Sequence, residues 1–327
     1  MGITGLKPFL KDLVPECFIN LSLDILNGKR LAIDGNNWMY VNMSISRKKV
    51  LAYNNPDDEN VDTLILEDWL QLLNNFVTKL LAKNITPVFI FDGTHPIDKH
   101  ATKEKRKLIK TEAYIKAQET DDPDIKRKLL MGCTHIKSYE YHKFLDKLEE
   151  LGISCITANG DGEQLCSTLA IEGKVSAVLS TDTDNLVYGC PLLVTKVKAN
   201  EMECIRHDMI LYKLGIRHDV FVDLCIMAGC DYNSNIKGYG LKKSLKLLEC
   251  HKSIDQLSSI LDISVLNHIR CRDLFKFRPS YIAASKLNVK TGQANVDPTT
   301  GLLPGLAIPP LYFGPLSNIS RKFRTAI

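Results

Sequence analysis

Two short apolar runs that each end in an aspartate constrain most strongly how this chain can fold. The first reads Arg-Leu-Ala-Ile-Asp and ends at Asp34, and the second reads Pro-Val-Phe-Ile-Phe-Asp and ends at Asp92. Runs of this length are typical of strands buried on both faces. Apolar residues recur at helical spacing over residues 62–83 between them. The pattern therefore predicts strand, helix, strand, which is the repeating unit of a parallel sheet.

The alternation continues along the chain. Further strands are predicted over residues 153–156, 175–180 and 192–197. Helices are predicted over residues 101–118, 125–150 and from 160–163 to about 172, and residues 217–275 are expected to be wholly helical. Residues 279–315 are rich in Pro, Gly and Asn, which favours irregular structure or a tail packed on the surface. The expected fold class is α/β, with a mostly parallel central sheet and helices on both faces.

The composition excludes several classes of protein. We find no apolar run of about 18 residues and no N-terminal signal pattern, so neither membrane insertion nor secretion is expected. The ten cysteines include no Cys-x-x-Cys pair, which argues against a zinc site and favours reduced cysteines inside a cell. A net charge of +4 says little alone, because the basic residues are gathered in zones.

Residues 99–116 hold seven Lys or Arg and two acids, and residues 237–252 hold five Lys and one acid. The end of the chain, residues 321–324, is also basic. Each zone taken alone could be a solvated helix face. Basic zones beside an acidic site suit a polyanion whose phosphates must meet a metal ion.

Carboxylates gather at strand ends and at one helix start. The six concerned are Asp34, Asp92, Asp161, Glu163, Asp182 and Asp184. Because ligands bind at the carboxyl ends of strands in parallel sheets, these side chains should share one crevice. Taken singly, Asp161 could be only a helix cap and Asp34 only a turn residue.

Together, packed carboxylates repel one another unless a cation neutralises them. Hard oxygen ligands select Mg²⁺, for which Mn²⁺ can substitute. Two such ions about 4 Å apart form a device for cleaving phosphodiesters that needs no protein nucleophile.

A glycine-containing turn over residues 231–243 lies between two predicted helical stretches. Gly238 and Gly240 let its backbone approach a ligand closely, and the amides at the start of the next helix face an anion. Lys237, Lys242 and Lys243 surround the turn. An ordinary helix end is the alternative, but the pattern fits sequence-independent binding of a phosphate backbone.

Taken together, these motifs resemble those of the flap-endonuclease/XPG family of structure-specific 5′ nucleases. The resemblance covers about residues 1–260, and its motifs appear in the family's order. They are Met-Gly-Ile-Thr-Gly-Leu at the start, Ile33-Asp34, Val88–Gly93, Asp161–Cys166, Ser180–Asp184, and Ala228–Tyr232 followed by Ile236–Gly240. It implies a PIN-like 5′-nuclease domain that hydrolyses DNA at 5′ flaps and related junctions with two metal ions. It also implies 5′-3′ exonuclease activity in DNA replication, repair or recombination.

The resemblance assigns roles to individual residues. Asp231 joins the six carboxylates as a ligand of two Mg²⁺ ions, directly or through water. Lys99 and Arg106 would contact the scissile phosphate from a helical gateway, continued by a cap over roughly residues 107–135. Tyr40 would stack on a base near the cleavage point, and Gly2 would lie near the active site. The glycine turn would be a helix-two-turn-helix that grips duplex DNA, with backbone carbonyls over residues 235–239 holding K⁺.

Five regions follow from this assignment. They are an N-terminal nuclease region (1–98), a helical gateway and cap (99–135), an internal nuclease region (136–216), a helix-two-turn-helix region (217–275) and an irregular tail (276–327). The expected partner is branched or flapped double-stranded DNA, bound by a monomer in the nucleus or at an intracellular site of viral replication.

The chain departs from the family at two places. Asp161 stands where the family usually has Glu, so a metal contact there could be water-mediated. The last residues contain no clamp-binding box, which argues against a sliding-clamp partner. Two alternatives stay open: a Holliday-junction resolvase of the same family, and a catalytically silent protein that binds DNA structures.

Overall fold

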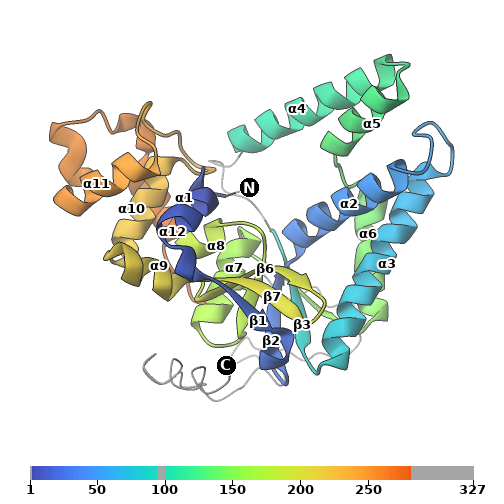
Figure 1. Ribbon diagram of the computed structural model, residues 1–327, viewed down its shortest axis with the longest axis horizontal. Coiled ribbons are helices and arrows are strands. Elements are labelled where there is room, and N and C mark those ends of the chain that lie inside the picture. The colour runs from blue at the N-terminus through green and yellow to red at the C-terminus, as the bar shows by residue number, and fades with distance from the viewer. Residues whose placement is uncertain (1, 94–99, 281–327) are drawn as a thin grey trace.

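The computed structural model describes residues 2–93 and 100–280, in which the strands form one seven-stranded sheet (Figure 1). The order across the sheet is β1-β7-β6-β5-β2-β3-β4. The strands are β1 (Phe18–Ser22), β2 (Arg30–Asp34), β3 (Thr86–Phe91), β4 (Ser154–Thr157), β5 (Ala177–Leu179), β6 (Leu192–Lys198) and β7 (Glu201–Arg206).

The chain reverses its direction across the sheet between β2 and β5. From β2 it builds outward through β3 to β4, then returns to the other side of β2 to form β5 and β6. These five strands pair in parallel, whereas β7 is antiparallel to both β6 and β1. Such a reversal opens a crevice at the carboxyl ends of the two strands that flank it.

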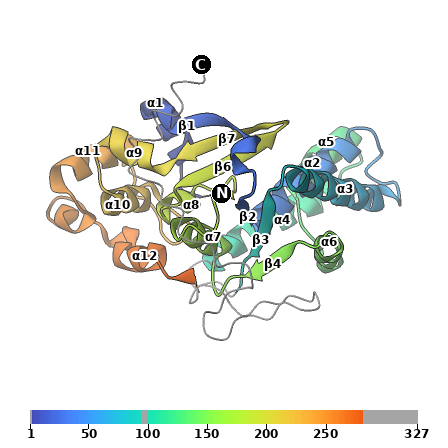
Figure 2. The same cartoon turned by 90° about the horizontal axis from the view of Figure 1, so that it is seen from below.

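Helices cover both faces of the sheet, as Figure 2 shows. One face packs against α2 (Gly35–Leu51), α3 (Val61–Ala82) and α6 (Ser138–Glu150). The other packs against α1 (Leu6–Leu13), α7 (Gly162–Ile171), α8 (Asp184–Val187), α9 (His207–Leu214) and α10 (His218–Ala228). Strand alternation separates the two cores: Leu31 and Ile33 face the first, and Ala32 faces the second.

Two groups of helices extend beyond these layers. An arm made of α4 (His100–Glu119) and α5 (Pro123–Gly132) stands over α2 in Figure 1. At the other end, α11 (Leu241–His251) packs on α10, and α12 (His268–Phe275) also contacts α10. Short 3-10 segments connect the remaining parts: η1 (Pro15–Cys17), η2 (Leu23–Leu26), η4 (Ile254–Ser259) and η5 (Ser264–Leu266).

The α/β fold class with a mostly parallel sheet and helices on both faces is confirmed. The predicted strand at 30–34 coincides with β2, and the predicted helix at 62–83 differs from α3 by one residue at each end. None of the helices within the described residues combines the length and the apolar character needed to span a membrane.

Two expectations about helices were wrong, and two strands were not predicted. One helix was expected over residues 125–150, but α5 and α6 are separate, because the buried Glu140 side chain accepts the Lys137 N–H and starts α6 anew. Residues 217–275 were expected to be helical around the glycine turn; that turn does divide α10 from α11, but the 3-10 segments η4 and η5, and not a continuous helix, join α11 to α12. Strands β1 and β7 were not predicted, because their mixed polarity lacks a continuous apolar run. The expected irregular tail falls largely at 281–327, outside the described residues.

An aromatic cluster centred on Phe144 joins α6 to the sheet. Its ring stacks on Trp69 at 4.9 Å between centroids and meets Trp38, Phe89 and Phe91 at 5.6–6.4 Å. Phe144 is fully buried. This cluster holds β3, whose end carries Asp92, against the helices of one face.

Truncation of this cluster should cost much of the stability. We expect Phe144→Ala to lower the free energy of unfolding by about 3–5 kcal/mol, because a large buried ring is replaced by a cavity. Urea denaturation followed by far-UV circular dichroism measures this. Tyr53→Ala, at a side chain that is 89% exposed, is the control and should change it by less than about 0.5 kcal/mol. Equal effects of the two changes would refute the central role of Phe144.

Candidate active site

The carboxylates lie where the sheet reverses direction. Asp34 is the last residue of β2 and Asp92 directly follows β3. Asp182 lies three residues beyond the end of β5, and Asp184 begins α8. Asp161 and Glu163 flank the first residue of α7, which crosses from β4 back to β5. The parallel register of β2 with β3 and β5 brings these ends together.

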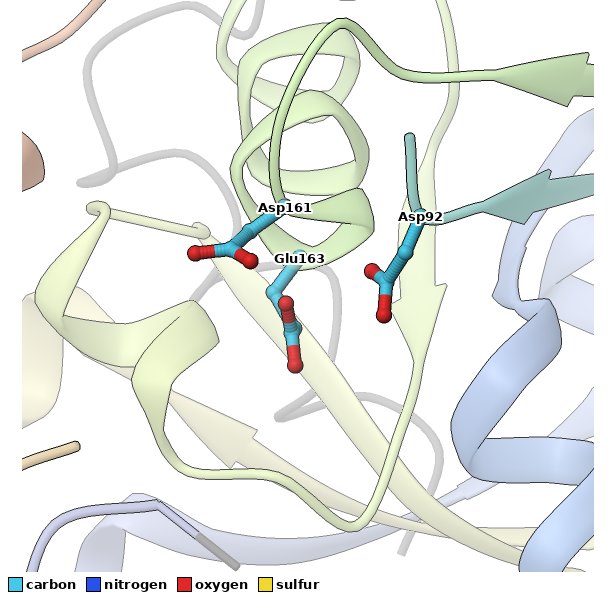
Figure 3. A group of neighbouring side chains, drawn as sticks. All are labelled: Asp92, Asp161 and Glu163. Atoms are coloured by element: carbon cyan, nitrogen blue, oxygen red, sulfur yellow. The ribbon is translucent and has the colours of Figure 1, made fainter. Parts of the chain in front are cut away.

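Asp92, Asp161 and Glu163 form the tightest group (Figure 3). Each offers one oxygen, and these oxygens all lie within 4.8 Å of one another. The Gly162 N–H donates to Asp92 Oδ1 at 2.8 Å, which fixes the β3 carboxylate on the start of α7. Among the described residues, this is the group whose oxygens are close enough to share a cation. Asp34, Asp182, Asp184 and Asp231 lie outside it.

Asp161 occupies the N-cap position of α7, yet its side chain makes no capping hydrogen bond. Instead its Oδ2 accepts a hydrogen bond from the Tyr232 hydroxyl. The interpretation of Asp161 as a simple cap is therefore wrong. Asp161 is only 5% exposed, so its carboxylate is held inside the protein by this donor.

Asp34 caps the start of α2 and also accepts a hydrogen bond from the loop after β5. Its Oδ1 accepts the Asn37 N–H at 3.0 Å at the start of α2, and its Oδ2 accepts the Ser180 hydroxyl at 2.8 Å. Burial, and then the charges of Asp92 and Asp182, raise the pKa of Asp34 to about 7. The two hydrogen bonds lower this pKa but do not cancel the increase. A divalent cation would offset the repulsion that contributes to this shift.

The loop after β5 is tied to the N-terminus. The Asp184 N–H donates to Asp182 Oδ1 at 3.1 Å, and the Ile3 N–H donates to Thr183 Oγ1 at 3.1 Å. Gly2 has φ of +99°, and a Cβ there would overlap Asp182 Oδ1 and Thr183 Oγ1. Gly2 thus lies against a carboxylate, at a position where only glycine fits.

Asp231 follows α10 and is buried, at 7% exposed. Its neighbour Tyr232 reaches Asp161, which places this turn beside the start of α7. Neither Tyr232 nor Ser180 was predicted from the sequence to hold a carboxylate. The sequence pattern around each residue is only weakly informative. Tyr232 directly follows Asp231, and Ser180 lies between the end of a strand and Asp182.

The predicted basic pair is only partly located. Lys99 lies outside the described residues, and Arg106 lies in α4 with its side chain outside them. Tyr40, on α2, is half-buried, and Lys110 of α4 sits 4.9 Å from its ring centroid and donates to the Thr134 carbonyl at 3.0 Å. Burial, and then the charge of Asp92, raise the pKa of Tyr40. Tyr40 therefore stands between the arm and the carboxylates.

The glycine turn borders an open cavity of about 640 Å³ together with α1. Gly238 has φ of +85°, and Gly240 caps α11. Lys237, Gly238, Gly240, Lys242 and Lys243 are all exposed. Lys242 is paired with Asp12 of α1 at 2.5 Å, a partner that the sequence did not indicate.

Comparison with known proteins agrees with this geometry. Family models match the XPG N-terminal domain over residues 1–113 and the XPG I-region over residues 152–231. Flap endonuclease 1 of Cryptosporidium muris is 32% identical over 90% of this chain and 66% of its own length. Flap endonuclease 1 of Candida dubliniensis is 30% identical over 91% of this chain and 82% of its own. The chain thus spans slightly less than two thirds of the Cryptosporidium relative.

Solved structures share the fold. Flap endonuclease-1 from Methanococcus jannaschii aligns with a TM-score of 0.59 at 26% identity, covering 83% of this chain and 84% of that one. The catalytic core of Rad2 in complex with a DNA substrate aligns with a TM-score of 0.59 at 22% identity, covering 79% and 71%. The fold and the carboxylate cluster define an α/β protein with a PIN-like 5′-nuclease architecture. The chain belongs to the flap-endonuclease/XPG family, as its motifs indicated.

The raised pKa of Asp34 predicts how stability depends on pH without metal. The folded state holds this proton more tightly than the unfolded state, whose Asp pKa is about 4. Between about pH 4 and pH 7 the free energy of unfolding should fall as pH rises, by up to about 1.4 kcal/mol per pH unit from this group. Urea denaturation in EDTA at several pH values measures this.

Asp34→Asn is the control for that measurement, because the amide cannot ionise and should flatten this part of the profile. Mg²⁺ should stabilise the unsubstituted protein more at pH 8 than at pH 5. A profile that the Asp34→Asn substitution leaves unchanged would show that Asp34 is not the group responsible.

The contact of Gly2 with Asp182 predicts a local effect on cation binding. Gly2→Ala should displace Asp182 and weaken Mn²⁺ binding measured by isothermal titration calorimetry. Gly5→Ala is a matched control: Gly5 also has positive φ, of +71°, but a Cβ there would meet only Leu241, at 3.9 Å. Both changes cost about 1–2 kcal/mol of backbone strain. Equal losses of Mn²⁺ affinity would contradict a specific role for Gly2.

Proposed function

We propose that this chain is a divalent-metal-dependent nuclease that hydrolyses DNA at 5′ flaps and related junctions, with 5′-3′ exonuclease activity. The observation that carries the proposal is the convergence of buried and half-buried carboxylates, from the ends of β2, β3 and β5 and the start of α7, at one edge of the sheet. Cations relieve the repulsion within such a set, and hard oxygen donors suit Mg²⁺ or Mn²⁺. The similarity to flap endonuclease 1 proteins supports the choice of DNA as substrate.

The ligands divide into two groups. Asp92, Asp161 and Glu163 would hold one ion, since their oxygens already approach within 4.8 Å. Asp34, Asp182, Asp184 and Asp231 would complete the site, directly or through water. When bound, Mg²⁺ lowers the pKa of a water and offsets charge on the phosphate oxygens. The protein positions the carboxylates: Gly162 N–H holds Asp92, Ser180 holds Asp34, and Gly2 makes room for Asp182.

The DNA would be bound by elements on either side of the crevice. The exposed Lys237, Lys242 and Lys243 around the glycine turn would contact duplex phosphates, and the turn's carbonyls over residues 235–239 would hold K⁺. The arm of α4 and α5 would take the 5′ single strand, with Tyr40 stacking on a base near the cleaved bond. Lys99 and Arg106 would act as catalytic cations at the scissile phosphate.

Removal of one carboxylate tests the nuclease proposal. Asp182→Ala should abolish Mg²⁺-dependent cleavage, because the site loses a ligand, while binding of flap DNA in Ca²⁺ persists and weakens steeply with salt. Labelled flap, nicked, gapped, blunt and four-way substrates, with and without Mg²⁺, provide the assay. Glu150→Ala, at an exposed acid whose ion-pair partner Lys147 lies on the same helix, α6, is the control and should keep cleaving.

The outcomes separate the alternatives. Cleavage of four-way junctions in preference to flaps would make the chain a resolvase. Binding of every branched substrate without cleavage in Mg²⁺ or Mn²⁺ would make it a silent DNA-structure-binding protein. Cleavage retained by Asp182→Ala in a clean preparation would refute the metal-site assignment.

A further inference from the structure

Two buried tyrosines are linked by hydrogen bonds to the carboxylate of Asp161. The Tyr232 hydroxyl donates to Asp161 Oδ2, and the Tyr188 hydroxyl lies 3.3 Å from that of Tyr232. Tyr188 and Tyr232 are 6% and 7% exposed, so water does not replace these contacts. A burial this deep is stable only if each hydroxyl has a partner, and the chain from Tyr188 through Tyr232 to Asp161 provides it.

The rings of Tyr188 and Tyr232 both pack against α12. Phe275 makes edge contacts with Tyr188 at 5.3 Å and with Tyr232 at 5.5 Å between centroids. The end of α12 is in turn tied to α7, because Gln164 Nε2 donates to the carbonyls of Leu274 and Lys276 at 3.3 and 3.2 Å. The contacts thus close a ring from α7 through Asp161, Tyr232 and α12 back to α7. Tyr232 cannot shift without disturbing this ring.

The two oxygens of Asp161 have different surroundings. Oδ2 is the acceptor for Tyr232, and one Asp161 oxygen is within 4.8 Å of oxygens of Asp92 and Glu163. In Figure 3 one oxygen lies on the side of Glu163 and the other points the opposite way. The hydrogen bond from Tyr232 favours one of the staggered orientations of the Asp161 side chain.

We propose that Tyr232 is a positioning residue that holds Asp161 in the orientation in which it can serve a divalent cation, with Tyr188 orienting the Tyr232 hydroxyl. This inference rests on the metal site of the proposed function. Hydrogen bonds that orient a metal ligand generally contribute about 10–100-fold to metal affinity. The short side chain of Asp161 makes such a donor more important, since it reaches less far than a glutamate.

Tyr232→Phe is the sharpest test, because it removes the hydroxyl and keeps the ring that packs on Phe275. Mn²⁺ alone, titrated by calorimetry, should bind about 10-fold more weakly. The Mg²⁺ concentration for half-maximal cleavage should rise by a similar factor, whereas flap binding in saturating Ca²⁺ should stay unchanged. Tyr188→Phe should have a smaller effect in the same direction. Tyr212→Phe, at a tyrosine 78% exposed, should have none.

A double-substitution cycle separates positioning from a general structural role. In the Asp161→Ala background, Tyr232→Phe should cause no further loss of Mn²⁺ affinity, because the group that it positions is already gone. A further loss there would overturn the inference. So would wild-type Mn²⁺ affinity in Tyr232→Phe, or a lower melting temperature with unchanged Mn²⁺ binding.

The proposed function and this inference can fail separately. If the unsubstituted chain cuts no DNA but binds Mn²⁺, and Tyr232→Phe weakens that binding, the inference stands and the nuclease proposal falls. If the chain cuts flaps and Tyr232→Phe has the wild-type Mg²⁺ dependence, only the inference is overturned.

Discussion

Mutual repulsion among buried carboxylates is the constraint on which the rest of this structure depends. Asp34, Asp161, Asp182, Asp184 and Asp231 are each at most 7% exposed, the half-buried Asp92 and Glu163 lie among them, and little water is present to weaken the repulsion between their charges. The protein counters this with donors: the Asn37 and Gly162 amides and the hydroxyls of Ser180 and Tyr232. These donors stabilise the ionised forms, yet the pKa of Asp34 is still raised to about 7. Bound cations would neutralise the repulsion that remains.

The sheet order explains why the acids meet at all. In a sheet that grew in one direction, the ends of β2 and β5 would be separated by the strands between them. Here the chain returns across β2, so that β2 lies between β3 and β5 in parallel register. The loops after all three strands then open on the same edge. The α7 start arrives at that edge because the crossover from β4 to β5 must pass over the face of β3 and β2.

Much of this site was predictable, because strand ends and their carboxylates are local patterns. Asp34 and Asp92 follow apolar runs, and a parallel sheet dictates where those runs end. What the sequence could not supply are the contacts between distant residues: Tyr232 with Asp161 and Ser180 with Asp34 are 71 and 146 positions apart. No local pattern encodes such pairs. Likewise β7 forms because it pairs with both β6 and β1, and β1 forms at the sheet's edge because it pairs with β7, whereas each alone has too mixed a pattern to be predicted.

Three of the segments proposed to meet DNA lie beside the carboxylates. The N-terminus contacts the loop of Asp182, Tyr40 lies close enough to Asp92 for its pKa to respond to that charge, and the glycine turn reaches Asp161 through Tyr232. A displacement of any of these segments therefore changes the environment of at least one acid. Because binding of cations and of DNA would then share the same contacts, each should alter the affinity for the other, and thermodynamic linkage makes that effect reciprocal. The hydrogen bond from Tyr232 to Asp161 thereby both stabilises a buried carboxylate and connects the glycine turn to the acids beside which the N-terminus and Tyr40 lie.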